Sequence, residues 1–356
     1  MTTRIYLDHA ATTPVLPAAR AAMADALARW ANPSSPHADG RAARALLEEA
    51  RAAIAAALGW PHDIILTSGA SEAITIAAAR AKVAGRIIGA TEHDVVPFAM
   101  GSGATVLPVD QGGIIDLDAL EAALAQGPAL LAIQLVNNET GVIQPAEAIL
   151  KRVRAAGSLW LADCAQAAGK IELPDADFIA VSAHKLGGPP GVGVLLVRDI
   201  AVLEPSGGQE RGYRRGTQDV PGAAAFAAAL ESGAFREAMP RLALLRERLS
   251  DGMRHAGAIV IAANTPRIAT IGAVALPGLA SASLLVQLDL AGFSVSAGSA
   301  CSSGSLKPSH VLAAMGIAPD LATSTIRISF GPHTSDAEVD AFLAAFRAIA
   351  ERRRAA

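Results

Sequence analysis

Six short apolar runs, several of them separated by helical patterns, constrain the fold of this chain more than any other feature. The runs read DIILT (63–67), RIIGA (86–90), LLAIQLV (130–136), SLWLA (158–162), DFIAV (177–181) and VGVLLV (192–197). Helical segments such as PAEAILKRVRAAG (145–157) lie between them. Strands that alternate with helices are typical of the α/β class and predict a largely parallel sheet with helices on both faces.

The length of the chain indicates two domains. At 356 residues it exceeds what one hydrophobic core normally supports. After a long helical stretch at about 222–255, strand-like segments interleave with helices up to the end of the sequence. We therefore predict a large α/β domain over residues 15–235 and a smaller α+β domain formed by residues 1–14 and 236–356.

Charge and composition exclude several classes of protein. A net charge of −3 gives no electrostatic reason to expect a nucleic acid or an anionic membrane as a partner. No uncharged apolar run approaches the roughly 18 residues of a membrane-spanning helix, and the first residues do not resemble a signal peptide. We expect a cytoplasmic protein in which both cysteines, Cys164 and Cys301, are free thiols.

Five of the apolar runs are followed at once by small or polar residues. These clusters read SGAS (68–71), TEH (91–93), NNETG (137–141), DCAQ (163–166) and SAHK (182–185). In open α/β sheets, ligands bind beyond the carboxyl ends of the strands. One such cluster is the ordinary composition of a loop, but clusters that together offer imidazole, amide, carboxylate and lysine groups predict a binding site.

Lys185 and Asp163 are the pair of side chains that pyridoxal phosphate requires, one for a Schiff base and one for the pyridinium nitrogen. Either residue alone is more often an ordinary polar group at a strand end. Lys185 is followed by LGGPPGVG (186–193), whose glycines allow the backbone to pass close to a ligand. The segment TSGAS (67–71) opens a helix, and the start of a helix suits a phosphate group.

Cys301 lies in the stretch SAGSACSSGSLKPSH (296–310), which has no large apolar side chain before Leu306. A structural cysteine normally packs against bulky neighbours, so this stretch favours a reactive thiol. Cys164 directly follows a predicted strand, and we interpret it as a packed core residue.

With Lys185, Asp163 and Cys301, the chain resembles cysteine desulfurases of the nitrogen-fixation and iron–sulfur-cluster type (NifS/IscS-like, class-V aminotransferase family). The similar stretches follow the family's order and include YLDHAATTP (6–14), NPSSPHADGR (32–41), TEHDVV (91–96), VNNETGVIQP (136–145), SAHKLGGPPGVG (182–193), GGQERGYRRGTQDV (207–220) and SAGSACSSGSLKPSHVLAAMG (296–316). The resemblance implies the type I fold of pyridoxal-phosphate enzymes, which is aspartate aminotransferase-like. In this fold a large domain with a mainly parallel seven-stranded sheet precedes a smaller α+β C-terminal domain.

The resemblance also implies how the cofactor ring is held. Lys185 would bind pyridoxal phosphate covalently and later move protons at the substrate's Cα. Asp163 would hold the ring nitrogen, and Gln166 would hydrogen-bond the ring hydroxyl. His93 would stack on the ring and exchange protons, and Asn138 would contact the cofactor as well as the substrate.

For the phosphate and the substrate, the resemblance implies further contacts. The phosphate would lie among Ala70, Ser71, Ser182 and His184. Thr217 would reach the phosphate of a second subunit, so a homodimer is implied. Arg327 and Asn138 would grip the substrate carboxylate, Arg327 through a two-pronged contact.

The implied reaction converts L-cysteine into L-alanine and leaves a persulfide on Cys301. A sulfur-acceptor protein, such as an iron–sulfur scaffold, would collect the persulfide for cluster, thio-cofactor or tRNA biosynthesis, and no metal is expected. Two alternatives stay open: a selenocysteine lyase or another pyridoxal-phosphate lyase or aminotransferase of the same fold, and a non-enzymatic scaffold or regulatory subunit. A non-enzymatic protein would have no reason to retain both Lys185 and Cys301.

Overall fold

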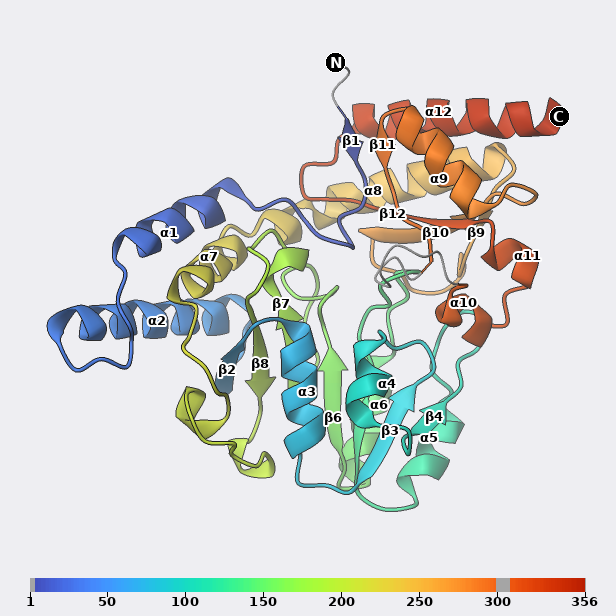
Figure 1. Cartoon of the computed structure of the whole chain (residues 1–356). Coiled ribbons are helices and arrows are strands. Elements are labelled where there is room, and N and C mark those ends of the chain that lie inside the picture. Colours follow the sequence, from blue (N-terminus) through green and yellow to red (C-terminus); the bar gives the residue numbers. More distant parts are fainter. Residues whose placement is uncertain (1–3, 299–307, 356) are drawn as a thin grey trace.

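The computed structural model describes residues 4–298 and 308–355, and its main layer is a seven-stranded sheet with the order β2-β8-β7-β6-β5-β3-β4 (Figure 1). The strands are β2 (Asp63–Thr67), β3 (Gly85–Gly89), β4 (Thr105–Leu107), β5 (Ala129–Ala132), β6 (Leu159–Asp163), β7 (Phe178–Ser182) and β8 (Gly193–Val197). β8 runs antiparallel to β2 and β7, and the remaining pairs are parallel. The mainly parallel seven-stranded sheet is therefore confirmed.

Helices cover both faces of this sheet because side chains alternate along each strand. Ile64 of β2 packs in a core that includes Ile54 of α2 (Ala38–Ala57). The next residue, Ile65, packs in the opposite core with Ile74 of α3 (Ala70–Arg80). The other helices of this domain are α1 (Pro17–Ala28), α4 (Val95–Met100), α5 (Leu117–Leu124), α6 (Ala146–Ala155) and α7 (Val220–Glu231).

The predicted helical stretch at about 222–255 is two helices rather than one. α7 ends at Glu231, and α8 (Ala234–His255) begins after Gly233. Gly233 has a φ of 62°, a left-handed conformation that an L side chain adopts only with strain. The chain therefore turns at this glycine and passes from the large sheet to the smaller domain.

The smaller domain has a core of its own and lies above one end of the large sheet in Figure 1. Its antiparallel sheet has the order β12-β10-β9, and β1 pairs with β11. The strands are β1 (Ile5–Tyr6), β9 (Ile259–Val260), β10 (Ile271–Ala275), β11 (Phe293–Ser294) and β12 (Thr325–Ser329), and the helices besides α8 are α9 (Ser281–Leu290), α10 (His310–Ala314), α11 (Pro319–Ala322) and α12 (Asp336–Ala355). Ser335 and Glu338 form a reciprocal capping box at the start of α12.

The N-terminal segment joins the two domains. After β1, the backbone N–H of Ala10 donates to Ser329 Oγ of β12 at 2.8 Å. Farther along, Thr13 N–H donates to the carbonyl of His184 and Leu16 N–H to that of Gly187, both at 2.8 Å. Across the described part of the chain, no helix is both long and apolar enough to span a membrane.

Replacing Gly193 with alanine should destabilise the protein, because β8 passes against the turn before α3 at this residue. A Cβ at Gly193 would lie 2.7 Å from the Cα of Gly69 and would also meet the carbonyl oxygen of Val181. Both are backbone atoms that cannot rotate away, so Gly193→Ala should lower the free energy of unfolding by about 1–3 kcal/mol. Denaturant unfolding measures this loss.

Gly103→Ala is the matched control. Nothing lies within 4 Å of a methyl group added at Gly103. The change in its free energy of unfolding should stay within about 0.5 kcal/mol. Equal losses in the two variants would contradict the close approach at Gly193.

Candidate active site

A cavity of about 370 Å³ is lined by residues at or after the ends of large-sheet strands and by one residue of β12. Of the residues predicted to form the site, it is lined by Ala70, Ser71, His93, Asn138, Asp163, Gln166, Ser182, His184, Lys185 and Arg327. Thr217 is exposed and does not line this cavity. Cys301 lies outside the described residues. A larger cavity, of about 600 Å³, lies between the end of α2 and residues 169–175 and contains none of the predicted site residues.

Lys185 is held by the N-terminal segment. It lies in the turn Ala183–Lys185 after β7, and its Nζ donates to the carbonyl oxygens of Ala10 at 2.6 Å and Ala11 at 2.8 Å. Gln166 Nε2 donates to the same Ala10 carbonyl at 2.9 Å. Ala10 and Ala11 lie in the stretch YLDHAATTP that supports the family resemblance, but their residue type alone predicts no role for them.

Asp163 ends β6 and is partly exposed toward the cavity. The backbone N–H of Ala165 donates to its Oδ1 at 2.9 Å. Burial raises the pKa of Asp163, while this hydrogen bond and the positive charges of His93 and Lys185 oppose the rise. A desolvated carboxylate in this place gains stability from a cationic ligand group, and a protonated pyridine ring is such a group.

The start of α3 suits a phosphate. Gly69 precedes the helix with a φ of 150°, and no side chain in the described part of the chain caps its first backbone N–H groups. Helix starts leave such N–H groups for an anion. Burial lowers the pKa of His184 to about 4, assisted by Lys185 and Lys170, so this imidazole is neutral near pH 7. A neutral imidazole still has one N–H to donate.

Glu92 lies next to His93 and is only 2% exposed. Its Oε2 accepts the backbone N–H of Gln134 at 2.9 Å, and its Oε1 is buried without a hydrogen-bond partner among residues 4–298 and 308–355. Burial raises the pKa of Glu92 well above its usual value, and the nearby charge of Asp163 adds to the rise. A raised pKa favours the protonated carboxylic acid. The cluster TEH contains Glu92, but the residue pattern alone predicts no role for it.

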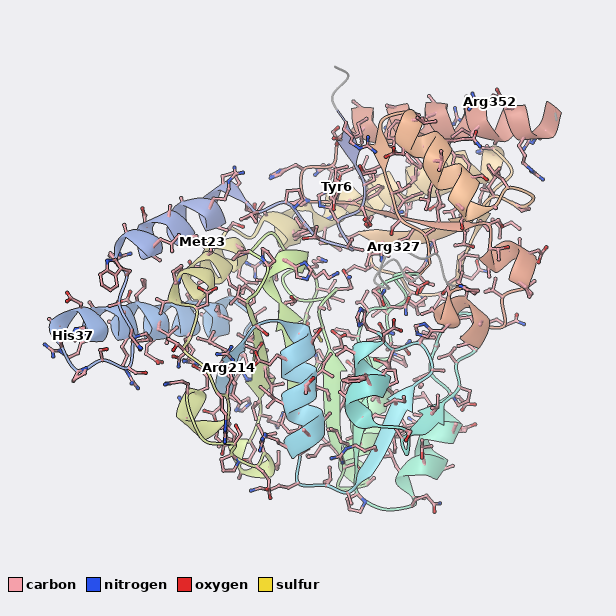
Figure 2. The ribbon with its side chains drawn as sticks, viewed as in Figure 1. Tyr6, Met23, His37, Arg214, Arg327 and Arg352 are labelled. Carbon is pink, nitrogen blue, oxygen red and sulfur yellow. The ribbon has the colours of Figure 1, made fainter. Side chains whose placement is uncertain are left out.

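Arg327 brings a guanidinium from β12 to the cavity, and Figure 2 shows it where the small domain meets the large one. It is 4% exposed. Its Nη2 pairs with Asp8 Oδ1 at 2.8 Å, and its Nη1 donates to the carbonyl of Asn138 at 3.0 Å. These contacts orient the guanidinium before any ligand binds. The role of Asp8 is not predicted by its sequence position, because its partner lies 319 residues away.

The residues that line the cavity fit pyridoxal phosphate. Asp163 and Lys185 provide the carboxylate and the amine that the ring nitrogen and the carbonyl carbon require. Gln166 Oε1 is buried and lacks a partner in the described chain, so it can accept a hydrogen bond from a ring hydroxyl. The start of α3 and the neutral His184 offer N–H groups to the same cavity.

Glu92→Gln should change how stability depends on pH. Because the pKa of folded Glu92 lies above that of the unfolded chain, the folded protein retains a proton that the unfolded chain loses. The wild-type free energy of unfolding therefore falls as pH rises through the interval between these pKa values. Glutamine cannot ionise, so the stability of Glu92→Gln relative to the wild type should rise as pH increases above about 4.3, the ordinary pKa of a glutamate in an unfolded chain. A difference in the free energy of unfolding that stays constant above this pH would contradict a raised pKa of Glu92.

Comparison with known proteins identifies the family. The Aminotransferase class-V profile matches residues 5–342. A cysteine desulfurase of Cereibacter sphaeroides is 36% identical, with 99% of this chain and 97% of the relative covered. The X-ray structure of a NifS-like protein from Rickettsia africae ESF-5 is similar with a TM-score of 0.89 and 30% identity, covering 98% of this chain and 99% of that one. A structure described as SspA in complex with cysteine has a TM-score of 0.78 and 28% identity, covering 94% and 100% of the two chains.

The predicted resemblance is confirmed, and the chain belongs to the class-V aminotransferase family, whose pyridoxal-phosphate enzymes include the cysteine desulfurases.

Proposed function

We propose that this protein is a pyridoxal-phosphate-dependent cysteine desulfurase. The observation that supports it best is the single cavity that Lys185, Asp163 and Arg327 line together. The end-to-end similarity to a cysteine desulfurase and to a structure that contains cysteine supports the substrate. The products are L-alanine and a persulfide on Cys301, which an acceptor protein such as an iron–sulfur scaffold collects.

Different side chains around the cavity hold the cofactor and move protons. When bound, pyridoxal phosphate supplies an electron sink for negative charge at the substrate's Cα. Lys185 holds the cofactor and moves the Cα proton, and Asp163 keeps the ring nitrogen protonated. Gln166 contacts the ring hydroxyl, and His93 covers the ring face and exchanges protons.

The start of α3 would hold the phosphate, and a second subunit would complete its site. Within one chain, the phosphate-binding residues would be Ala70, Ser71, Ser182 and His184. Thr217, which does not line the cavity of its own chain, reaches the phosphate of the partner in a homodimer. Its loop is held by the buried Glu210, which binds Arg51 Nη1 at 2.6 Å, Arg51 Nη2 at 3.0 Å and the backbone N–H of Leu66 at 2.8 Å.

The substrate binds through its carboxylate and gives up its sulfur. Arg327 and Asn138 hold the carboxylate. The Cys301 thiolate attacks the substrate Sγ; the substrate's Cβ–S bond breaks, and the Cβ carbon gains a proton. The electrons of the broken bond stay with carbon, so cysteine and a thiol become alanine and a persulfide without an outside oxidant.

We propose the domain boundaries expected from the sequence, with residues 15–235 in one unit and 1–14 with 236–356 in the other. The separate cores support this division, because one core consists of Leu7 and residues between Ala238 and Ala350. Ile268 and Ile271 pack instead with the core of the large sheet, so the two units share a packed boundary.

Cys301→Ala should abolish sulfide release from L-cysteine and leave the absorbance of the bound cofactor unchanged. The wild type, given cysteine and a dithiol that reduces the persulfide, should form alanine and sulfide in equal amounts. Cys164→Ala is the matched control and should keep its activity, because Cys164 is fully buried in the large-domain core. Full cysteine activity in Cys301→Ala would refute the role assigned to this thiol.

Arg327→Lys should raise KM for cysteine about 10- to 100-fold, since lysine keeps the charge but loses the two-pronged contact, and hydrogen bonds to charged groups contribute roughly 1.5–3 kcal/mol. Steady-state sulfide release measures this change. Arg248→Lys, at an exposed pair with Asp336, should leave KM unchanged. An unaltered KM in Arg327→Lys would show that the substrate carboxylate binds elsewhere.

A further inference from the structure

Ser309 connects the start of α10 to the large domain. Its hydroxyl donates to Glu139 Oε2 at 2.6 Å and accepts the backbone N–H of Leu312 at 3.0 Å. Ser309 and Glu139 are each 4% exposed. One hydroxyl therefore caps a helix and binds a buried carboxylate that lies on the other domain's side of the boundary. Loss of that hydroxyl would leave the carboxylate buried and short of a partner, which is costly.

Glu139 directly follows Asn138 in a tightly bonded turn. The backbone N–H groups of Glu139 and Thr140 donate to Asn137 Oδ1 at 3.0 Å and 2.9 Å. Asn137 Nδ2 in turn donates to the carbonyl of Thr91 at 3.1 Å. A displacement of Glu139 would therefore move both the turn and its neighbour Asn138.

His310 makes the corresponding contact on the other loop. Its Nε2 lies 2.9 Å from the carbonyl oxygen of Glu92, to which it donates, and its Nδ1 lies 3.8 Å from Asp94 Oδ1. Glu92 and Asp94 are the residues on either side of His93. His310 therefore holds the backbone that presents His93 to the cavity.

Two consecutive residues of the small domain thus contact the chain neighbours of two proposed site residues. We infer that Ser309, His310 and Glu139 are positioning residues that hold the loops of Asn138 and His93 against the start of α10. The effect on turnover rests on the proposed function, because the chain before Ser309 contains the stretch with the sulfur-accepting thiol. The contacts themselves, and their effect on backbone protection, do not depend on it.

Ser309→Ala tests this inference. We expect kcat for sulfide release to fall about 10- to 100-fold, the size of effect that a small misplacement of reacting groups produces. The absorbance of the bound cofactor should stay unchanged, since the contacts of Lys185 and Asp163 are intact, and KM for cysteine should rise because the displaced Asn138 holds the substrate carboxylate. Ser309→Thr keeps the hydroxyl and should recover most of the lost kcat.

Ser335→Ala is the matched control. Ser335 also caps a helix of the small domain and also pairs with a glutamate, Glu338, but it lies at the start of α12. Losing this cap should lower thermal stability in the same way as Ser309→Ala while kcat stays at the wild-type level. If both variants lose kcat equally, the effect of Ser309 is general stability and the inference is wrong.

Hydrogen–deuterium exchange separates this inference from the proposed function. In Ser309→Ala, the amides of residues 92–95 and 137–141 should exchange faster, and in Ser335→Ala they should not. This comparison tests the inference even if the wild type releases no sulfide. Such an outcome would refute only the proposed function. The positioning role would be overturned if amide exchange in Ser309→Ala is unchanged. It would also be overturned if exchange is faster while kcat stays at the wild-type value. If Ser309→Ala does not fold, Glu139→Gln is compared with the wild type by the same measurements.

Discussion

The site depends on how the N-terminal segment places main-chain oxygens and one carboxylate against two cations. The carbonyls of Ala10 and Ala11 accept hydrogen bonds from Lys185, and Asp8 pairs with Arg327. The segment can do this only because it enters from the small domain beside β12 and then bonds to the turn after β7. Both cations therefore have partners before any ligand arrives, which reduces the cost of burying them between two domains.

Burial also decides which groups near the cavity hold a charge. His184 is neutral near pH 7 because its ring is desolvated close to two lysines, and burial beside Asp163 raises the pKa of Glu92. Asp163 accepts a hydrogen bond from Ala165, and His93 and Lys185, which lie nearby, oppose the rise in its pKa. The Asp163 carboxyl group is therefore available to a ring nitrogen, and the N–H groups at the start of α3 and on His184 are neutral donors.

Periodicity and strand ends predicted much of the fold and site, because both are local properties of the chain. The apolar runs placed most strands of the large sheet, and the polar residues after them proved to line one cavity. The antiparallel direction of β8 was not predicted, since a strand's direction depends on its partners. Nor were the roles of Asp8, Glu92 and Glu139, whose partners lie far away in sequence. Asp8 pairs with Arg327, and Glu139 with Ser309.

The loop that contains Thr217 keeps its shape within a single chain. Glu210 and Arg211 both have left-handed backbones, with φ of 51° and 55°, and the buried bonds of Glu210 to Arg51 and Leu66 offset that strain. A second copy would thus meet a surface that is already ordered and would lose little conformational entropy on association. The strength of subunit pairing would then reflect the fit of two preformed surfaces.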